Sequence, residues 1–106
     1  MSAKFIQEGK AIEITAAADI TANDVVVFGG IVGVAPADIS SGGTGAIQIE
    51  GVYEMPKESG LAISGGVAVN WDTTSGYVTT SSGGVACGKT IAPAESSATV
   101  VLVKLN

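Results

Sequence analysis

The apolar residues of this chain recur at every second position, in short runs separated by glycine-rich connections. In AIQIEGVYEM (46–55), Ile47, Ile49, Tyr53 and Met55 fall on one side of the alternation and polar residues on the other. A period of two places successive side chains on opposite faces of a β-strand, whereas an amphipathic helix needs apolar residues at i, i+3, i+4 and i+7. No long stretch has the helical spacing. The chain is therefore predicted to fold from strands.

The connections between these runs contain the residues that tight turns require. Gly29-Gly30 separates two Val-rich runs and fits a primed hairpin turn, because glycine tolerates a positive φ. About eight short strands at this spacing predict an all-β fold, a small barrel or sandwich of mainly antiparallel strands. The 106 residues suit a single β domain (1–106), in which residues 1–8 form an extended N-terminal arm or an edge strand. The strand candidates are AKFIQ (3–7), AIEIT (11–15), VVVF (25–28), IVGVA (31–35), AIQIEGVYEM (46–55), GVAVNWD (66–72), YVTT (77–80), VACGKTIA (85–92) and ATVVLVKL (98–105).

The two halves of the chain show a weak internal sequence similarity. VAPAD (34–38) and IAPAE (91–95) each follow an Ile-Thr or Ile-Ser step, Ile20-Thr21 and Ile63-Ser64, and a Val-rich run. Two β-units related by duplication would produce this pattern. Chance similarity in a sequence of low diversity would produce it as well, and the sequence leaves both interpretations open.

The charge balance bears on the class of partner. The formal net charge is −5, with five lysines, ten carboxylates and no histidine. Nucleic-acid binding is not predicted, because phosphate recognition needs Lys and Arg concentrated on one face. The N-terminus MSAKFIQEGK lacks the apolar core of a signal peptide, and the longest apolar run, residues 25–35, is too short for a membrane helix. We expect synthesis in the host cytoplasm and no membrane contact.

The stretch GGVACGKT (83–90) matches the phosphate-binding pattern G-x-x-x-x-G-K-[ST]. A working phosphate loop also needs a helix that begins directly after it, since the phosphates sit at the helix N-terminus. Here IAPAESSATVVLVKLN follows, with Pro93 at its third position after Thr90 and a β-branched tail. The stretch is interpreted as a glycine-rich turn followed by a strand, and neither ATP nor any other cofactor is expected.

Other catalytic arrangements lack their residues. Without histidine there is no Ser-His or Cys-His nucleophile pair and no imidazole metal ligand. Cys87 is interpreted as a small buried thiol. Glu54 and Glu58 would be the one candidate carboxylate pair, and we expect both to be solvated. The chain is predicted not to be an enzyme.

Several segments are informative through their order and spacing along nearly the whole chain. They are AKFIQEGKAIEIT (3–15), DVVVFGGIVGVAPADI (24–39), EGVYEMPK (50–57), GVAVNWD (66–72) with GYVTT (76–80), and VLVKLN (101–106). Together they resemble the phage capsid cement (head decoration) protein family, whose members have sometimes been labelled RecA/RadA-like recombinases. The resemblance implies a β-rich protein on the outer surface of a tailed-phage head, bound to the major capsid protein and often assembled as a trimer.

Two places are candidates for a capsid or subunit interface. Lys4, Phe5, Ile6 and Gln7 belong to a strand-like segment near one end of the chain, which adds an edge strand to a neighbouring sheet or completes the protein's own sheet. Trp71, the single tryptophan, is either core packing or an interface anchor.

Three classes of function remain. The first is a virion structural protein that stabilises the capsid lattice. The second is another non-enzymatic phage β-module, such as a tail or fibre accessory. The third is a nucleotide-binding recombination protein, which the missing helix after GGVACGKT disfavours.

Overall fold

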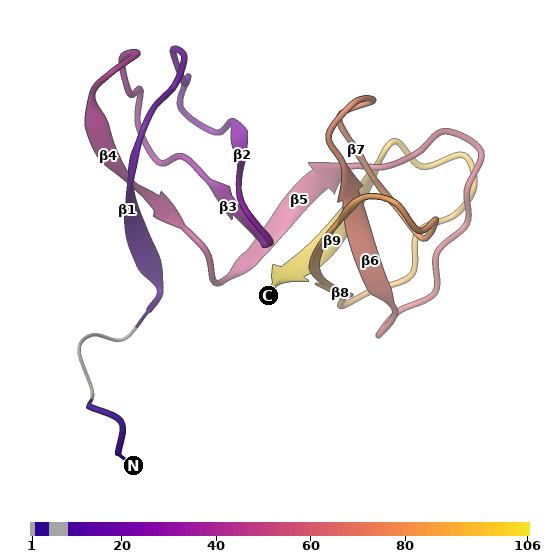
Figure 1. The fold of residues 1–106 in the computed structure, drawn as a ribbon. Coiled ribbons are helices and arrows are strands. Elements are labelled where there is room, and N and C mark those ends of the chain that lie inside the picture. Colours follow the sequence, from indigo (N-terminus) through magenta and orange to yellow (C-terminus); the bar gives the residue numbers. More distant parts are fainter. Residues whose placement is uncertain (1, 5–8) are drawn as a thin grey trace.

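The computed structural model describes residues 2–4 and 9–106, and within them the protein is all β, without a helix (Figure 1). Its nine strands lie in two antiparallel sheets, so the all-β prediction is confirmed. The strands are β1 (Ala11–Thr15), β2 (Val25–Phe28), β3 (Ile31–Val34), β4 (Thr44–Gln48), β5 (Val52–Pro56), β6 (Ala68–Asp72), β7 (Tyr77–Thr79), β8 (Val85–Thr90) and β9 (Val100–Leu105). Because the described residues contain no helix at all, none of them forms a helix that could span a membrane.

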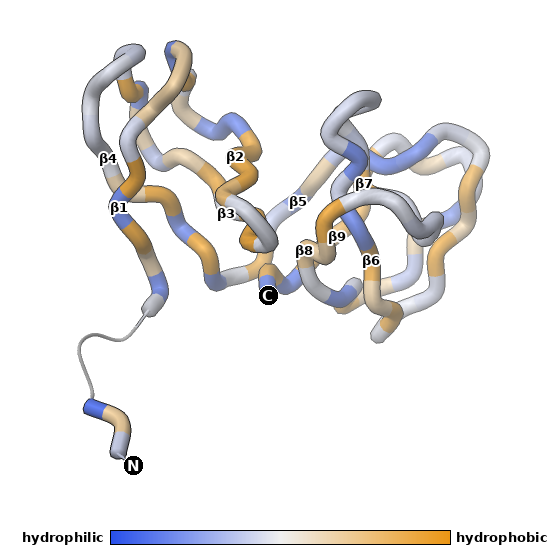
Figure 2. Tube along the Cα trace, in the orientation of Figure 1, coloured by the Kyte–Doolittle hydropathy of each residue, from blue (hydrophilic) through white to orange (hydrophobic). Residues whose placement is uncertain are grey.

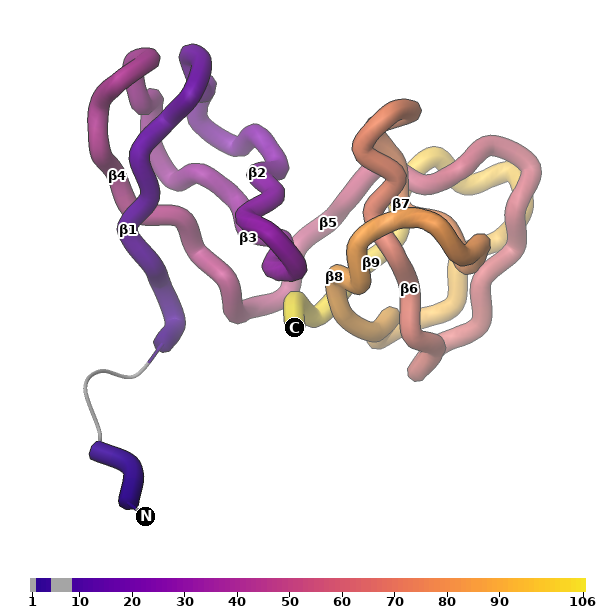
Figure 3. The backbone as a smooth tube through the Cα atoms, viewed as in Figure 1, coloured from indigo at the N-terminus to yellow at the C-terminus, as the bar shows by residue number. Residues whose placement is uncertain are grey.

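The chain completes one sheet before it begins the other. The first sheet has the strand order β1-β4-β3-β2 and the second the order β5-β9-β8-β6-β7. Figure 3 follows the backbone from the indigo and magenta strands of the first sheet into the pink, orange and yellow strands of the second. The predicted Gly29-Gly30 hairpin is present, with Phe28 opposite Ile31 and Gly29 at φ 58°.

The prediction of one continuous strand over residues 46–55 is wrong. The alternating run is divided between β4 in the first sheet and β5 in the second, with a break at Ile49–Gly51. Gly51 has φ +118°, a backbone conformation that other residues rarely adopt. The alternation continues across the break, so the period of two gives no sign that the chain changes sheets there.

The two sheets repeat one four-stranded motif. We call residues 11–48 the N-terminal unit and residues 52–105 the C-terminal unit. Strands β1, β4, β3 and β2 of the first correspond to β5, β9, β8 and β6 of the second, in the same order, and β7 is an addition at the β6 edge. The registers match as well, because cross-strand pairs of the first sheet have counterparts in the second. In the first sheet the pairs are Ala11↔Gln48, Thr15↔Thr44, Val26↔Gly33 and Val34↔Gln48. Their counterparts in the second sheet, in the same order, are Val52↔Lys104, Pro56↔Val100, Val69↔Gly88 and Lys89↔Lys104.

Main-chain contacts outside the strands repeat too. The bridge between Ile20 and Ile39 has its counterpart between Ile63 and Ala94. Asn23, at φ 74°, donates its N–H to the Ala35 carbonyl at 2.7 Å, and Gly66, also at φ 74°, donates to Thr90 at 2.7 Å. The structure therefore favours a repeated unit over chance similarity.

Only one of the two sequence similarities between the halves of the chain falls at structurally equivalent positions of this repeat. Ile20-Thr21 and Ile63-Ser64 occupy corresponding positions, as the matching bridges require. VAPAD and IAPAE do not, because Val34 corresponds to Lys89 and the IAPAE segment begins two residues later. Alignment by residue identity places Pro36 opposite Pro93, whereas alignment by strand pairing places Val34 opposite Lys89.

The main hydrophobic core joins the two units. Val32 and Val34 of β3 pack with side chains of the C-terminal unit, and Figure 2 shows apolar segments of both sheets where the units approach each other. Asn106 links them by hydrogen bonds: its Nδ2 donates to the Val32 carbonyl at 3.1 Å and the Ile49 carbonyl at 2.6 Å, and its N–H donates to Cys87 at 2.9 Å. The buried members of the core are Val32, Val34, Met55, Ile63, Val69, Trp71, Val78, Cys87, Ala94, Val101, Val103 and Leu105.

Candidate interaction site

The stretch GGVACGKT ends in a β-strand. Residues 85–90 form β8, and Gly88 pairs with Leu105 of β9 on one side and Val69 of β6 on the other. Gly88 has φ +145°, and a Cβ there would lie 2.0 Å from the Lys104 carbonyl oxygen. The glycine is thus required by the close approach of β8 to β9, and the extended backbone does not form the loop that cradles phosphate.

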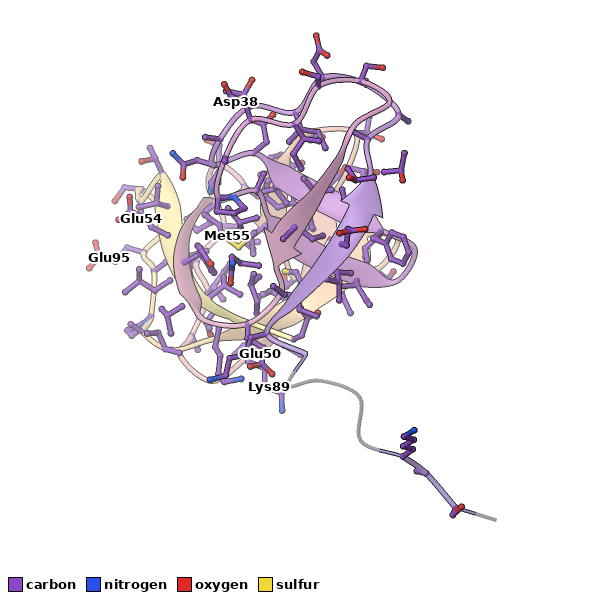
Figure 4. All side chains as sticks on the ribbon, turned by 90° about the vertical axis from the view of Figure 1, so that its left-hand side faces the viewer. Asp38, Glu50, Glu54, Met55, Lys89 and Glu95 are labelled. Atoms are coloured by element: carbon purple, nitrogen blue, oxygen red, sulfur yellow. The ribbon has the colours of Figure 1, made fainter. Side chains whose placement is uncertain are left out.

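Lys89 is exposed on the outer face of this sheet, and Figure 4 shows its side chain projecting from the body of the protein. We expect Lys89→Ala to change the free energy of unfolding by less than about 0.5 kcal/mol, as is usual for surface sites. Thermal melts with and without ATP and Mg²⁺ check this, since a bound nucleotide would raise the melting temperature. ATP should raise it for neither protein. A rise in the parent that Lys89→Ala abolishes would contradict our interpretation of GGVACGKT.

The remaining reactive groups have structural roles. Cys87 is fully buried, burial raises the pKa of its thiol to about 11, and its Sγ donates to the Val69 carbonyl at 3.5 Å. Glu58 is half-buried rather than fully solvated: its carboxylate accepts hydrogen bonds from Tyr77 Oη at 3.3 Å and Thr79 Oγ1 at 3.0 Å, which fixes the loop after β5 to β7. Glu54 is exposed, as expected. The described part of the chain brings together no cluster of three or more Cys, Asp or Glu side chains that could hold a metal ion.

The sequence-predicted interface residues fall in two different environments. Lys4 is exposed, while Phe5, Ile6 and Gln7 lie outside the described residues. Trp71 is 8% exposed and belongs to the main core, opposite Val78 of β7. Its burial supports the core-packing interpretation. An interface role for any of these five residues stays a prediction.

The second sheet exposes an apolar surface that the sequence analysis did not single out. On β9, Val101, Val103 and Leu105 are buried, while Val100 and Leu102 point to the opposite face with 39% and 38% of their surface exposed. Val52 on β5 and Ile91 after β8 are each 51% exposed. We call Val52, Ile91, Val100 and Leu102 the outer-face patch.

The register of the second sheet brings these side chains together. Leu102 lies opposite Glu54 and Val100 opposite Pro56, Val52 pairs with Lys104, and the Ile91 N–H donates to the Leu102 carbonyl at 3.2 Å. A groove between residues 92–98 and β9 continues the patch and is lined by Val100 and Leu102. The sequence did contain a signal, because VVLVKL is apolar on both faces of its strand, and a strand with only one buried face would alternate with polar residues.

The fold and the outer-face patch together define a small all-β protein with an apolar surface of the kind found where proteins meet other proteins. The chain belongs to the phage cement protein family, whose model matches residues 6–105, nearly the whole sequence. The resemblance inferred from the motifs is thereby confirmed, and the family makes this a capsid-associated structural protein of a bacteriophage. No curated protein and no solved structure matches the chain.

Proposed function

We propose that this protein binds the outer surface of a tailed-phage head and stabilises the lattice of the major capsid protein, acting as a trimer without nucleotide, nucleic acid or catalysis. The observation that carries the proposal, beside family membership, is the outer-face patch. Exposed apolar residues gathered on one face of a sheet, rather than scattered singly, are typical of surfaces that bind other proteins. The patch is the surface that we assign to the capsid.

The composition of the surroundings suits such a contact. Glu54 lies directly opposite Leu102 and Lys104 directly opposite Val52 on the same exposed face, so charged side chains adjoin the apolar ones. Protein interfaces commonly combine an apolar centre with a polar rim. Because the chain is acidic overall, apolar and main-chain contacts rather than charge attraction are expected to carry attachment, and attachment should depend little on salt.

Stabilisation follows from mass action. A protein that binds the assembled lattice better than free capsid subunits opposes disassembly. Each contact can be weak, because an oligomer that holds several capsid subunits at once gains from a high effective concentration at every further site. Removing one patch side chain therefore removes one weak contact from every copy in the oligomer.

Leu102→Lys tests the proposal. The side chain is 38% exposed, so the substitution should leave the melting temperature nearly unchanged while it places a charge in the centre of the apolar contact. We expect attachment to heads that lack the protein to fall by about tenfold or more, as for a central interface residue. Thr73→Lys is the control. It introduces the same charge in the exposed turn between β6 and β7, at the opposite end of the sheet from β5 and β9, and should bind as the parent does.

Co-sedimentation with purified heads, paired with thermal melts, measures both quantities. Equal binding by Leu102→Lys and Thr73→Lys would remove the patch from the capsid contact. Binding to tails or fibres rather than heads would favour the accessory-protein alternative.

A further inference from the structure

A second apolar groove lies in the N-terminal unit, between the end of β1 and the edge strand β2. It differs from the outer-face patch in position and lining, and no part of the proposed function uses it. Its bottom is formed by Ile14 and Ala16, which are 7% and 3% exposed. The residues that line it are Ile14, Thr15, Ala16, Ala17, Ala18, Asp19, Ile20, Val26, Val27 and Phe28.

The repeat identifies what fills the same place in the C-terminal unit. There, β7 pairs antiparallel with β6, with Val78 opposite Trp71, and the same Val78 bridges Lys57 in parallel. The Glu58 N–H donates to the Val78 carbonyl at 3.0 Å. Strand β7 therefore lies between β6 and the residues that follow β5. In the N-terminal unit the corresponding place, between β2 and the residues that follow β1, is the groove.

If the N-terminal unit lacks a strand at the place of β7, then the side chains that β7 helps to bury should have exposed counterparts. By register, Val26 corresponds to Val69 and Phe28 to Trp71. Trp71, which is paired with Val78 of β7, is 8% exposed, whereas Phe28 is 52% exposed, the largest exposed fraction among the large apolar residues of the described chain. The Glu58 N–H corresponds to that of Ala17, an exposed residue whose N–H has no hydrogen-bond partner among residues 2–4 and 9–106.

We infer that this groove accepts residues 5–7 of a second copy of the chain as an added strand, in the position that β7 occupies in the C-terminal unit. Edge strands with unpaired main-chain groups readily take up an extended segment, and pockets for alternate side chains provide specificity. By the register of β7, Ile6 would lie opposite Phe28 and beside Ala16.

The sequence of the segment matches the chemistry of the groove. Tyr77-Val78-Thr79 and Phe5-Ile6-Gln7 share the pattern aromatic, β-branched, polar. The difference between Tyr and Phe is informative, because the Tyr77 hydroxyl donates to the Glu58 carboxylate. The counterpart of Glu58 is Ala17, which offers no carboxylate, so an aromatic residue without a hydroxyl suits this place.

The segment cannot reach the groove of its own chain. Ile6 and Lys10 are four residue steps apart along the chain, which span at most about 14 Å when fully extended. Lys10 and Ala16 flank the extended strand β1 and are six residue steps apart, about 20 Å. If residues 5–7 occupy this groove, they must therefore come from another copy of the chain.

Exchange of this segment is a head-to-tail contact, because the arm and the groove are different surfaces. Such contacts produce closed rings when the rotation between copies closes, and a trimer is one such ring. The inference rests on the repeat and on chain geometry and does not depend on the proposed capsid role.

Two complementary full-length variants test it. Ile6→Asp disables the arm and leaves the groove intact, while Phe28→Asp disables the groove and leaves the arm intact. We expect each variant alone to self-associate about tenfold more weakly than the parent, because an apolar contact is replaced by a buried carboxylate. Mixing the two should restore a 1:1 complex through the one intact arm and the one intact groove. Thr73→Asp is the matched control, since Thr73 is exposed in the turn between β6 and β7 and belongs to neither the groove nor the outer-face patch.

Sedimentation velocity of each protein and of the mixture, with thermal melts to verify folding, decides the outcome. The inference is overturned if the mixture stays monomeric, or if Phe28→Asp assembles as well as the parent and the Thr73→Asp control. It is also overturned if the parent is monomeric in solution and Phe28 is needed only for binding to heads, because the groove would then take a segment of the capsid protein. A loss of head binding by Leu102→Lys with intact self-association separates the proposed function from this inference.

Discussion

Replacing Gly88 with alanine should leave the protein unfolded or nearly so at physiological temperature. A Cβ at this position would lie 2.0 Å from the Lys104 carbonyl oxygen and 3.0 Å from the Asn106 nitrogen, both main-chain atoms of the neighbouring strand. The backbone is also held at φ +145°, which alanine rarely adopts. Because neither obstacle can move without separating β8 from β9, we expect a loss of more than about 4 kcal/mol, out of the 5–15 kcal/mol typical of a domain.

Two other glycines provide comparisons for the expected loss of stability in Gly88→Ala. Gly33 is the counterpart of Gly88 in the N-terminal unit, and its Cβ would lie 2.9 Å from the Gln48 carbonyl oxygen, so Gly33→Ala should destabilise the protein less. Gly30 has no atom within 4 Å of a Cβ and no positive φ, and Gly30→Ala should change stability by at most about 1 kcal/mol. Urea unfolding of the three variants checks the order. A Gly88→Ala protein as stable as Gly30→Ala would mean that β8 and β9 do not approach as described.

Lys57→Ala should destabilise the protein by about 2–4 kcal/mol, the range for a core truncation that also removes hydrogen bonds to a charged group. Lys57 is 5% exposed, and its Nζ donates to the Glu58 carbonyl at 2.8 Å and to the Leu61 carbonyl. These bonds hold the loop that positions Glu58 against β7. Alanine would leave both carbonyls without this donor and a void in place of the aliphatic stem.

Lys89→Ala is the matched control, because it removes the same side chain from an exposed position. Lys57→Met keeps most of the aliphatic stem and should therefore restore the packing contribution to the free energy of unfolding. The loss of stability that remains in Lys57→Met then measures the hydrogen-bond contribution. Chemical unfolding at one pH and salt concentration measures all three. Equal stability of Lys57→Ala and Lys89→Ala would show that the Lys57 side chain is not buried in solution.

Residue spacing was sufficient to predict the β-strands and several turns. The period of two, the Gly29-Gly30 hairpin and the turn at residues 72–76 were all present as expected, where Asp72 Oδ1 accepts N–H bonds from Thr74 at 2.9 Å and Ser75 at 3.0 Å. These features depend on neighbours in the sequence, because turn geometry and side-chain alternation are local properties of the backbone.

Local pattern was also sufficient to predict a strand at the end of GGVACGKT, but not to explain why position 88 is a glycine. The missing helix after Thr90 excluded a phosphate loop. Only the structure gave the reason for Gly88, which is contact with Lys104, sixteen residues further along the chain. A glycine required by a turn and a glycine required by a neighbouring strand look the same in sequence.

The sequence by itself determined the class of fold, the absence of histidine chemistry and, through the resemblance, the family. Tertiary structure alone decided the rest. It divided the alternating run at 46–55 between two sheets, buried Trp71 beside β7, left its counterpart Phe28 exposed, and gathered Val52, Ile91, Val100 and Leu102 on one outer face. The physical reason is that alternation states which side chains share a face of a strand, whereas burial of that face depends on which other strand, distant in the sequence, comes to lie against it.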